Sequence, residues 1–195
     1  MDDNELIPAA ACEVIPEIKV KDHRLVTLGV FLAVLSAVLI VIAVNFRYGC
    51  ERPIRSYFSA VENADGEKLI SSLPECVAVS LDESAAKLGF DSAAKWYEDE
   101  MLTDTLKELE EDHGKGIGIS YTVSGRRALS DDECGKLSEK LGSEFGSPSD
   151  VDKAYELDIT YTIKGRSGSV SEDKTVTVCK IGGKWSFAGL PDIIL

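Results

Sequence analysis

A run of 22 residues without a charged side chain, LVTLGVFLAVLSAVLIVIAVNF at positions 25–46, lies between two arginines. As a helix it extends about 33 Å, and the hydrocarbon core of a bilayer is about 30 Å thick. Only Thr27, Ser36 and Asn45 interrupt the run, so it lacks the polar face of a helix that packs on a small soluble domain. The sequence therefore predicts a single membrane-spanning helix over residues 25–46.

Two alternatives to a retained anchor are a cleaved signal peptide and lipid attachment at Cys50. The apolar region of a signal peptide is about 7 to 15 residues long and leads to a cleavage site with small residues. This run is longer and begins later in the chain. Gly49 and Cys50 resemble the end of a lipoprotein cleavage site, but Arg47 stands where such a site has an aliphatic residue. We therefore expect the segment to remain in the mature protein.

Basic residues are balanced across the segment, so the positive-inside rule predicts no orientation. Those within its range are Lys19, Lys21, Arg24, Arg47, Arg52 and Arg55. A short polar tail, one apolar segment and one large domain form the usual arrangement of a signal-anchor protein. We expect a disordered cytoplasmic tail at residues 1–24 and a juxtamembrane linker at 47–52. An extracytoplasmic domain at 53–195 completes the expected single-pass protein of the cell membrane.

Acidic residues dominate the expected domain. The chain has 34 acidic and 21 basic residues and a net charge of −13, and the tail holds only six of the acidic and three of the basic residues. A surface with this charge repels nucleic-acid phosphates and anionic lipid headgroups. Nucleic acid is therefore not an expected partner, and close contact of the domain with the membrane face is disfavoured. The expected bilayer contact is made by residues 25–46.

Five cysteines divide into Cys12 in the tail and four that follow the membrane segment. The four are Cys50, Cys76, Cys134 and Cys179. None has the C-x-x-C spacing of a zinc site. An oxidising compartment allows one or two disulfides among the four, and three complete pairings are possible. Free buried thiols remain the other interpretation, because spacing does not fix a pairing.

Helical periodicity begins at Pro53, which suits the first turn of a helix. One apolar face recurs at spacings of three and four residues, and its members are Ile54, Tyr57, Phe58 and Val61. A turn at residues 63–66 ends this helix, and a second short helical stretch ends at Pro74. Asp91 is suited to cap a longer helix through residue 112, with Gly114 beyond its end.

Alternation with a period of two follows, and it predicts strands at residues 117–124, 155–163 and 174–181. Ser130 and Glu133 form a capping-box pattern for a short helix through residue 141. A Gly-Gly pair at 182–183 predicts a tight hairpin. Beyond it, Trp185 and Phe187 are expected to point to the same, buried face. Helices followed by antiparallel strands predict an α+β domain in which helices cover one face of a curved sheet.

Four stretches carry a resemblance to a known family: PIRSYFSAVENADGEKLISSLP, the acidic helix after it, YELDITYTIKG and TVTVCKIGGKWSF. Together they are similar to the extracytoplasmic domains of uncharacterised single-pass membrane proteins of Gram-positive bacteria. The resemblance covers nearly all of the chain after Pro53 and implies a cystatin-like or nuclear transport factor two-like cone, with helices packed on a curved antiparallel sheet. Some relatives carry a zinc ribbon before the membrane helix, but the tail here has only Cys12.

Catalytic groups are scarce in the sequence. The two histidines are His23, beside the membrane segment, and His113, at a helix end, and neither lies in a nucleophile motif. Acidic clusters lack the loop spacing that wraps a cation. We therefore expect no catalytic centre, no metal and no cofactor.

Two functions from different classes remain. The first is a membrane-anchored binding or interaction module for a protein or small-molecule ligand, without catalysis. The second is an enzyme of the ketosteroid isomerase-like type, in which a carboxylate and a tyrosine act within an apolar pocket of the cone. The candidate pocket-lining residues are Tyr57, Tyr97, Tyr121 and Tyr161. A buried carboxylate beside one of them distinguishes the enzyme from the binding module.

Overall fold

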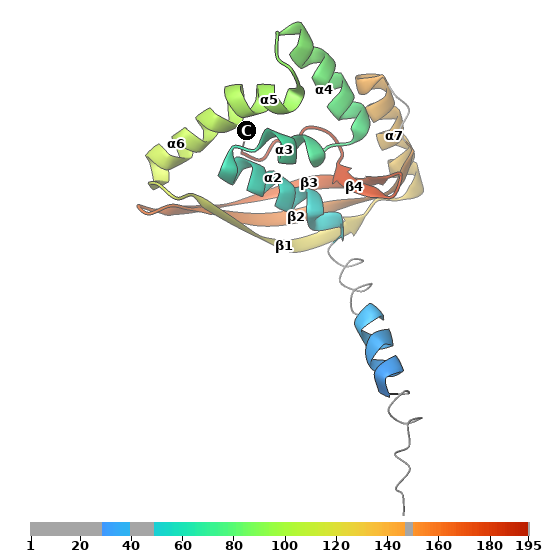
Figure 1. Ribbon diagram of the computed structural model, residues 1–195. Helices are drawn as coiled ribbons and strands as arrows, with labels where there is room; N and C mark the ends of the chain where they lie inside the picture. Colours follow the sequence, from blue (N-terminus) through green and yellow to red (C-terminus); the bar gives the residue numbers. More distant parts are fainter. Residues whose placement is uncertain (1–28, 40–48, 147–149, 195) are drawn as a thin grey trace, which may run out of the picture. The chain divides into compact units, whose positions relative to one another are not determined.

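The computed structural model describes residues 29–39, 49–146 and 150–194 (Figure 1). Residues 29–39 form a helix with exposed apolar side chains, and they belong to a different compact unit from the domain that begins before residue 49. Within the described ranges, no helix has both the length and the apolar character needed to cross a membrane. The predicted span over 25–46 lies partly outside these ranges, and the tail at 1–24 lies wholly outside them.

The domain is α+β, as the sequence predicts, with helices and a four-stranded antiparallel sheet. Its elements in chain order are η1 (Gly49–Glu51), α2 (Arg52–Asn63), α3 (Gly66–Ser71), α4 (Glu75–Lys87), α5 (Ala93–Tyr97), η2 (Glu98–Leu102), α6 (Thr103–His113), β1 (Gly118–Ala128), α7 (Asp131–Phe145), β2 (Val151–Lys164), β3 (Ser169–Ile181) and β4 (Lys184–Phe187). The strands lie side by side in the order β1-β2-β3-β4. The helices lie on one face of this sheet, with α2 nearest to it (Figure 1).

The sheet separates a buried face from an exposed one by simple alternation. Along β2, Leu157, Ile159, Tyr161 and Ile163 are at most 5% exposed, and polar side chains between them face away from the helices. The β1–β2 pairing shifts register after Val123, where a bulge bends the edge strand. A Cβ at Gly125 in this bulge would lie 2.3 Å from Asp158 Oδ2. A larger residue at this position would therefore require the Asp158 side chain to move.

Helix ends follow the local signals of the sequence at several positions. Pro53 lies in the first turn of α2, and Ala64 ends that helix in the left-handed conformation, with φ of 49°. Asp65 then caps α3 by accepting a hydrogen bond from the Lys68 backbone N–H. The predicted capping box is confirmed in α7, where Ser130 and Glu133 bond reciprocally. The pKa of Glu133 falls to about 2, because hydrogen bonds from the Ser130 N–H and, second, from Arg127 stabilise its charged carboxylate.

Two predictions need correction, and one helix was not predicted. Helix α4 was not predicted, although its buried residues Val77, Leu81 and Ala85 recur every four positions, because the apolar Val79 on its exposed side obscures that face. The long helix predicted from Asp91 begins after Ser92, whose side chain caps α5, and a π-helical turn at η2 interrupts it. Trp185 is only partly buried, because it lies on a four-residue edge strand, where its ring packs beside that of Tyr155.

Candidate functional site

Three of the four candidate tyrosines meet in the core around one phenylalanine. The ring centroids of Tyr57, Tyr121 and Tyr161 lie 5.6, 5.6 and 5.5 Å from that of Phe58. Phe58 is 2% exposed and Tyr57 is fully buried. The aromatic rings therefore fill the space between α2 and the sheet in which the isomerase-like alternative requires a ligand cavity. Tyr97 lies apart from this group, on α5, and burial raises its pKa.

The tyrosine hydroxyls bond mainly to the polypeptide backbone. The hydroxyl of Tyr57 accepts a 3.0 Å hydrogen bond from the Ile194 N–H. That of Tyr161 lies 2.6 Å from Glu172 Oε2, and burial followed by this carboxylate raises its pKa. Burial also raises the pKa of Tyr121. Glu172 is exposed, so its contact with Tyr161 lies at the surface and not within an apolar pocket. The side chain of Glu51, near Tyr121, is only 12% exposed, but its carboxylate is paired with Arg126.

The surface of the described domain carries a groove beside the edge strand, which we call the edge groove. It has a volume of about 630 Å³ and is lined by Glu62, Gly116, Gly118, Ile119, Ser120, Lys164, Gly165 and Arg166. None of the four candidate tyrosines lines it. Three glycines leave backbone groups accessible along its wall, and two cations and one carboxylate supply its charge. The groove is open to solvent, and it offers a ligand both apolar surface and these charged groups.

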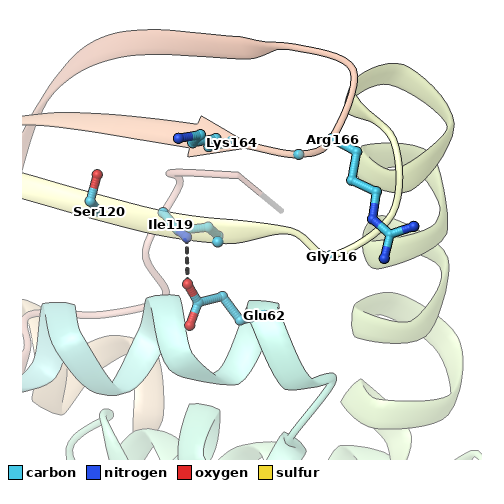
Figure 2. A pocket seen from close by; sticks show the side chains of 8 residues that line it. Glu62, Gly116, Ile119, Ser120, Lys164 and Arg166 are labelled. Carbon is cyan, nitrogen blue, oxygen red and sulfur yellow. Dashed lines mark hydrogen bonds between the residues drawn. The ribbon is translucent and has the colours of Figure 1, made fainter.

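Glu62 connects the helical layer to the edge strand. It lies near the end of α2, and its Oε1 accepts a hydrogen bond from the backbone N–H of Ile119 in β1 (Figure 2). Because this N–H points away from β2, it would otherwise be an unpaired group at the edge of the sheet. Glu62 therefore occupies one position of an otherwise open strand edge.

The cations of the groove come from the end of β2 and the turn that follows it. Lys164 and Arg166 are exposed, and neither forms an ion pair with any described residue. The turn is held in place because the Ser167 N–H donates a 2.7 Å hydrogen bond to the carbonyl of His113. A Cβ at Gly165 would approach the same carbonyl oxygen to 2.3 Å, so the turn requires glycine there. This packing fixes the backbone that carries both cations.

The free edge of β1 begins beside this groove. Ile119 lies opposite Ile163, and its N–H points away from β2. In an antiparallel pair, every second residue of an edge strand directs its N–H and C=O groups outward. The same groups of Tyr121 and Val123 therefore also point outward. No described residue accepts a hydrogen bond from these two N–H groups. The edge carries no proline or lysine from Gly118 to Gly125, the residues that most often protect a strand edge. Four backbone groups are thus available to another chain.

The four domain cysteines are free thiols and all are buried, so no disulfide joins them among the described residues. The Sγ of Cys179 lies 3.7 Å from the carbonyl of Phe187. Burial is the main reason that the pKa of Cys179 rises to about 11, with smaller contributions from Cys76 and Cys134. Burial likewise raises the pKa of Cys50. The described residues contain no group of three or more histidine, cysteine or acidic side chains arranged to hold a metal ion.

Sequence reasoning did not find the edge groove. Its residues come from positions 62, 116–120 and 164–166, which are brought together only by the sheet register and by the packing of α2. The signals present in the sequence were indirect: a strand edge without charge, and two cations that flank Gly165. No family model, no curated protein and no solved structure matches this chain.

Proposed function

We propose that this protein is a membrane-anchored, extracytoplasmic binding module that captures an extended peptide segment along the free edge of β1. Residues 25–46 anchor it, and the domain after them is a cystatin-like or nuclear transport factor two-like cone. The proposal rests mainly on one observation: beside the groove, the alternate residues Tyr121 and Val123 of β1 direct unpaired backbone N–H and C=O groups outward. An added strand gains main-chain hydrogen bonds at such an edge, and pockets beside it provide specificity.

The charge of the groove defines the peptide. Lys164 and Arg166 have no ion-pair partner among the described residues, and the carboxylate of Glu62 already accepts the Ile119 N–H. An acidic side chain or a C-terminal carboxylate is therefore the complementary ligand group, because Arg binds carboxylates through two parallel hydrogen bonds. The favoured ligand is an extended segment with β-branched residues and one acidic residue at the end that enters the groove.

The alternative is an isomerase-like enzyme, which requires a carboxylate beside a tyrosine within an apolar cavity. In the described domain, Phe58 fills the space among Tyr57, Tyr121 and Tyr161, and the carboxylate that bonds Tyr161 is exposed. These contacts support peptide binding over catalysis in the cone.

The experiment uses the full chain in nanodiscs to select ligands from a random heptapeptide library. We expect the selected peptides to share alternating β-branched residues and at least one acidic residue. A synthetic peptide of the selected sequence should bind the double variant Lys164→Glu/Arg166→Glu at least tenfold more weakly, because both cations become repulsive.

A matched control is Lys87→Glu/Lys136→Glu, which makes the same change of charge at exposed lysines outside the groove. It should alter the affinity by less than twofold. Equal affinity of the selected peptides for the wild-type chain and the groove variant would contradict the proposal.

The orientation is tested separately in intact cells. An impermeant amine reagent should label lysines of the domain, such as Lys87 and Lys136, and leave Lys19 and Lys21 unlabelled. If the tail were labelled and the domain protected, the proposed topology would be wrong. Peptide binding is tested separately by the library experiment.

A further inference from the structure

A second pocket lies at the end of the domain where the chain enters it. We call it the basic pocket; it has a volume of about 500 Å³. Its charged lining residues are Arg52 from α2 and Lys180 and Lys184 from the β3–β4 hairpin. Ser56 and the ring of Trp185 also line it. No acidic residue lines this pocket, although acidic residues outnumber basic ones in the chain by 34 to 21.

The three cations are available to a ligand. None of Arg52, Lys180 and Lys184 forms an ion pair with any described residue. The nearest acidic residue in sequence, Glu51, is engaged elsewhere, because its Oε1 lies 2.9 Å from Arg126 Nη2. Three like charges around one pocket repel one another, and a bound anion removes that repulsion.

The local backbone adds to this positive charge. Helix α2 begins at Arg52 beside the pocket; its N-cap residue is Glu51, whose side chain bonds to Arg126 and does not cap the helix, and its first turn contains no acidic residue. The positive end of the helix dipole therefore acts in the same direction as the three cations. The hydroxyl of Ser56, in the second turn, has no hydrogen-bond partner among the described residues and supplies a further donor.

The position of the pocket in the chain identifies the source of the anion. Gly49 is one of its lining residues, and a Cβ there would meet the Trp185 ring at 3.3 Å. Cys50 is 2% exposed and Glu51 is held by Arg126, so the chain enters the domain at a fixed point beside the pocket. The predicted membrane span ends at residue 46, and three further residues reach at most about 11 Å.

We propose that the basic pocket binds the phosphate of an anionic lipid headgroup. The three cations and the hydroxyl are all donors for the anionic oxygens of a phosphodiester, and a partly buried tryptophan suits the membrane interface. The net charge of the domain led to the opposite expectation, that it avoids anionic headgroups. Net charge averages over the surface, whereas this pocket brings three basic residues together without an acidic one. The proposal is independent of peptide binding in the edge groove and depends on the predicted span only for the source of the phosphate.

The test follows Trp185 fluorescence in the full chain, held in uncharged maltoside micelles. The variant Trp96→Phe makes Trp185 the sole tryptophan, because the chain has two. Dihexanoylphosphatidylglycerol is the probe, and dihexanoylphosphatidylcholine and inorganic phosphate are the comparisons. We expect a saturable change with the anionic lipid and at least tenfold weaker binding of the zwitterionic lipid and of inorganic phosphate.

Variants connect the binding to the pocket. Lys180→Gln/Lys184→Gln should weaken binding of the anionic lipid about thirtyfold. The control Lys87→Gln/Lys136→Gln, with the same loss of charge outside the pocket, should change it by less than twofold. Arg52→Gln provides an independent test on a different element if the double variant unfolds.

Three results would overturn the proposal. Equal binding of the two lipids would show that the phosphate charge is not recognised. If inorganic phosphate bound as tightly as the anionic lipid, the ligand of the pocket would be a free anion and not a lipid headgroup. An equal effect of the pocket variants and the control pair would place the binding elsewhere on the chain.

Discussion

Replacement of Glu62 by alanine tests the contact that links α2 to the edge strand. The substitution removes the acceptor for the Ile119 N–H, and a hydrogen bond to a charged group contributes about 1.5 to 3 kcal/mol. Two effects reduce this loss. The freed N–H lies in an open groove where water can bond to it, and Glu62 is the penultimate residue of α2, where a negative charge opposes the helix dipole by about 0.3 to 1 kcal/mol.

We therefore expect Glu62→Ala to lower the free energy of unfolding by about 1 kcal/mol. Glu62→Gln is the matched control, because its carbonyl oxygen can still accept the hydrogen bond and the adverse charge is absent. Its stability should stay within about 0.5 kcal/mol of the wild type. Urea unfolding of residues 49–195, which contain both faces of the core and should unfold in one cooperative transition, measures both values. Equal stabilities of the alanine and glutamine variants would refute the role assigned to this hydrogen bond.

Three further predictions concern the same domain. Gly66→Ala should destabilise it by about 3 kcal/mol, because a Cβ would lie 1.9 Å from a backbone oxygen of α5. Gly135→Ala, at an open position of α7, should instead stabilise it by about 0.5 to 1 kcal/mol. Similar effects of the two variants in urea unfolding would contradict this. Phe187→Ala should lower the free energy of unfolding by about 3 to 5 kcal/mol and Trp185→Ala by only about 1 to 2 kcal/mol, because Phe187 is 2% exposed and Trp185 is partly exposed. The reverse order would show that the tryptophan is the core residue. Alkylation of Cys179 in the folded domain should be slow at pH 8, and its rate should rise toward pH 11, because the raised pKa keeps the thiol protonated. The same shift should lower the free energy of unfolding as the pH rises from about 9 through 11. Rapid labelling at pH 8 would contradict the burial of this thiol.

Local signals predicted the parts of the fold that local physics determines. The capping box of Ser130 and Glu133 depends on residues three apart, and it forms as predicted. The alternation along β2 reports a strand with one buried face, and the Gly182–Gly183 pair forms the tight turn of the β3–β4 hairpin, with positive φ at both glycines. In each case the pattern and the structure that it predicts lie within a few residues.

Features that depend on distant contacts were not predicted. Helix α4 buries Val77, Leu81 and Ala85 on one face, but the apolar Val79 lies on its exposed side, so the buried face was not distinct in the sequence. Alternation assigned Trp185 and Phe187 to the same buried face. It could not show that Trp185 lies at the rim of the sheet, where it borders the basic pocket.

The candidate sites could be predicted even less. The edge groove requires the approach of α2 to β1 and of the β2–β3 turn to the end of α6. The basic pocket joins Arg52 to Lys180 and Lys184, which are separated by most of the domain sequence. The sequence contains these residues, but net charge and periodicity do not show which of them meet.

Residue-resolved hydrogen exchange of the full chain in nanodiscs, with and without a selected peptide, tests the central claim most directly. An added strand at the edge of β1 accepts hydrogen bonds from the outward N–H groups of Tyr121 and Val123, so their exchange should slow at least tenfold. The N–H groups of Thr122 and Thr160 point between β1 and β2 and should change little. Unchanged exchange at Tyr121 and Val123 on a chain saturated with peptide would contradict strand addition at this edge.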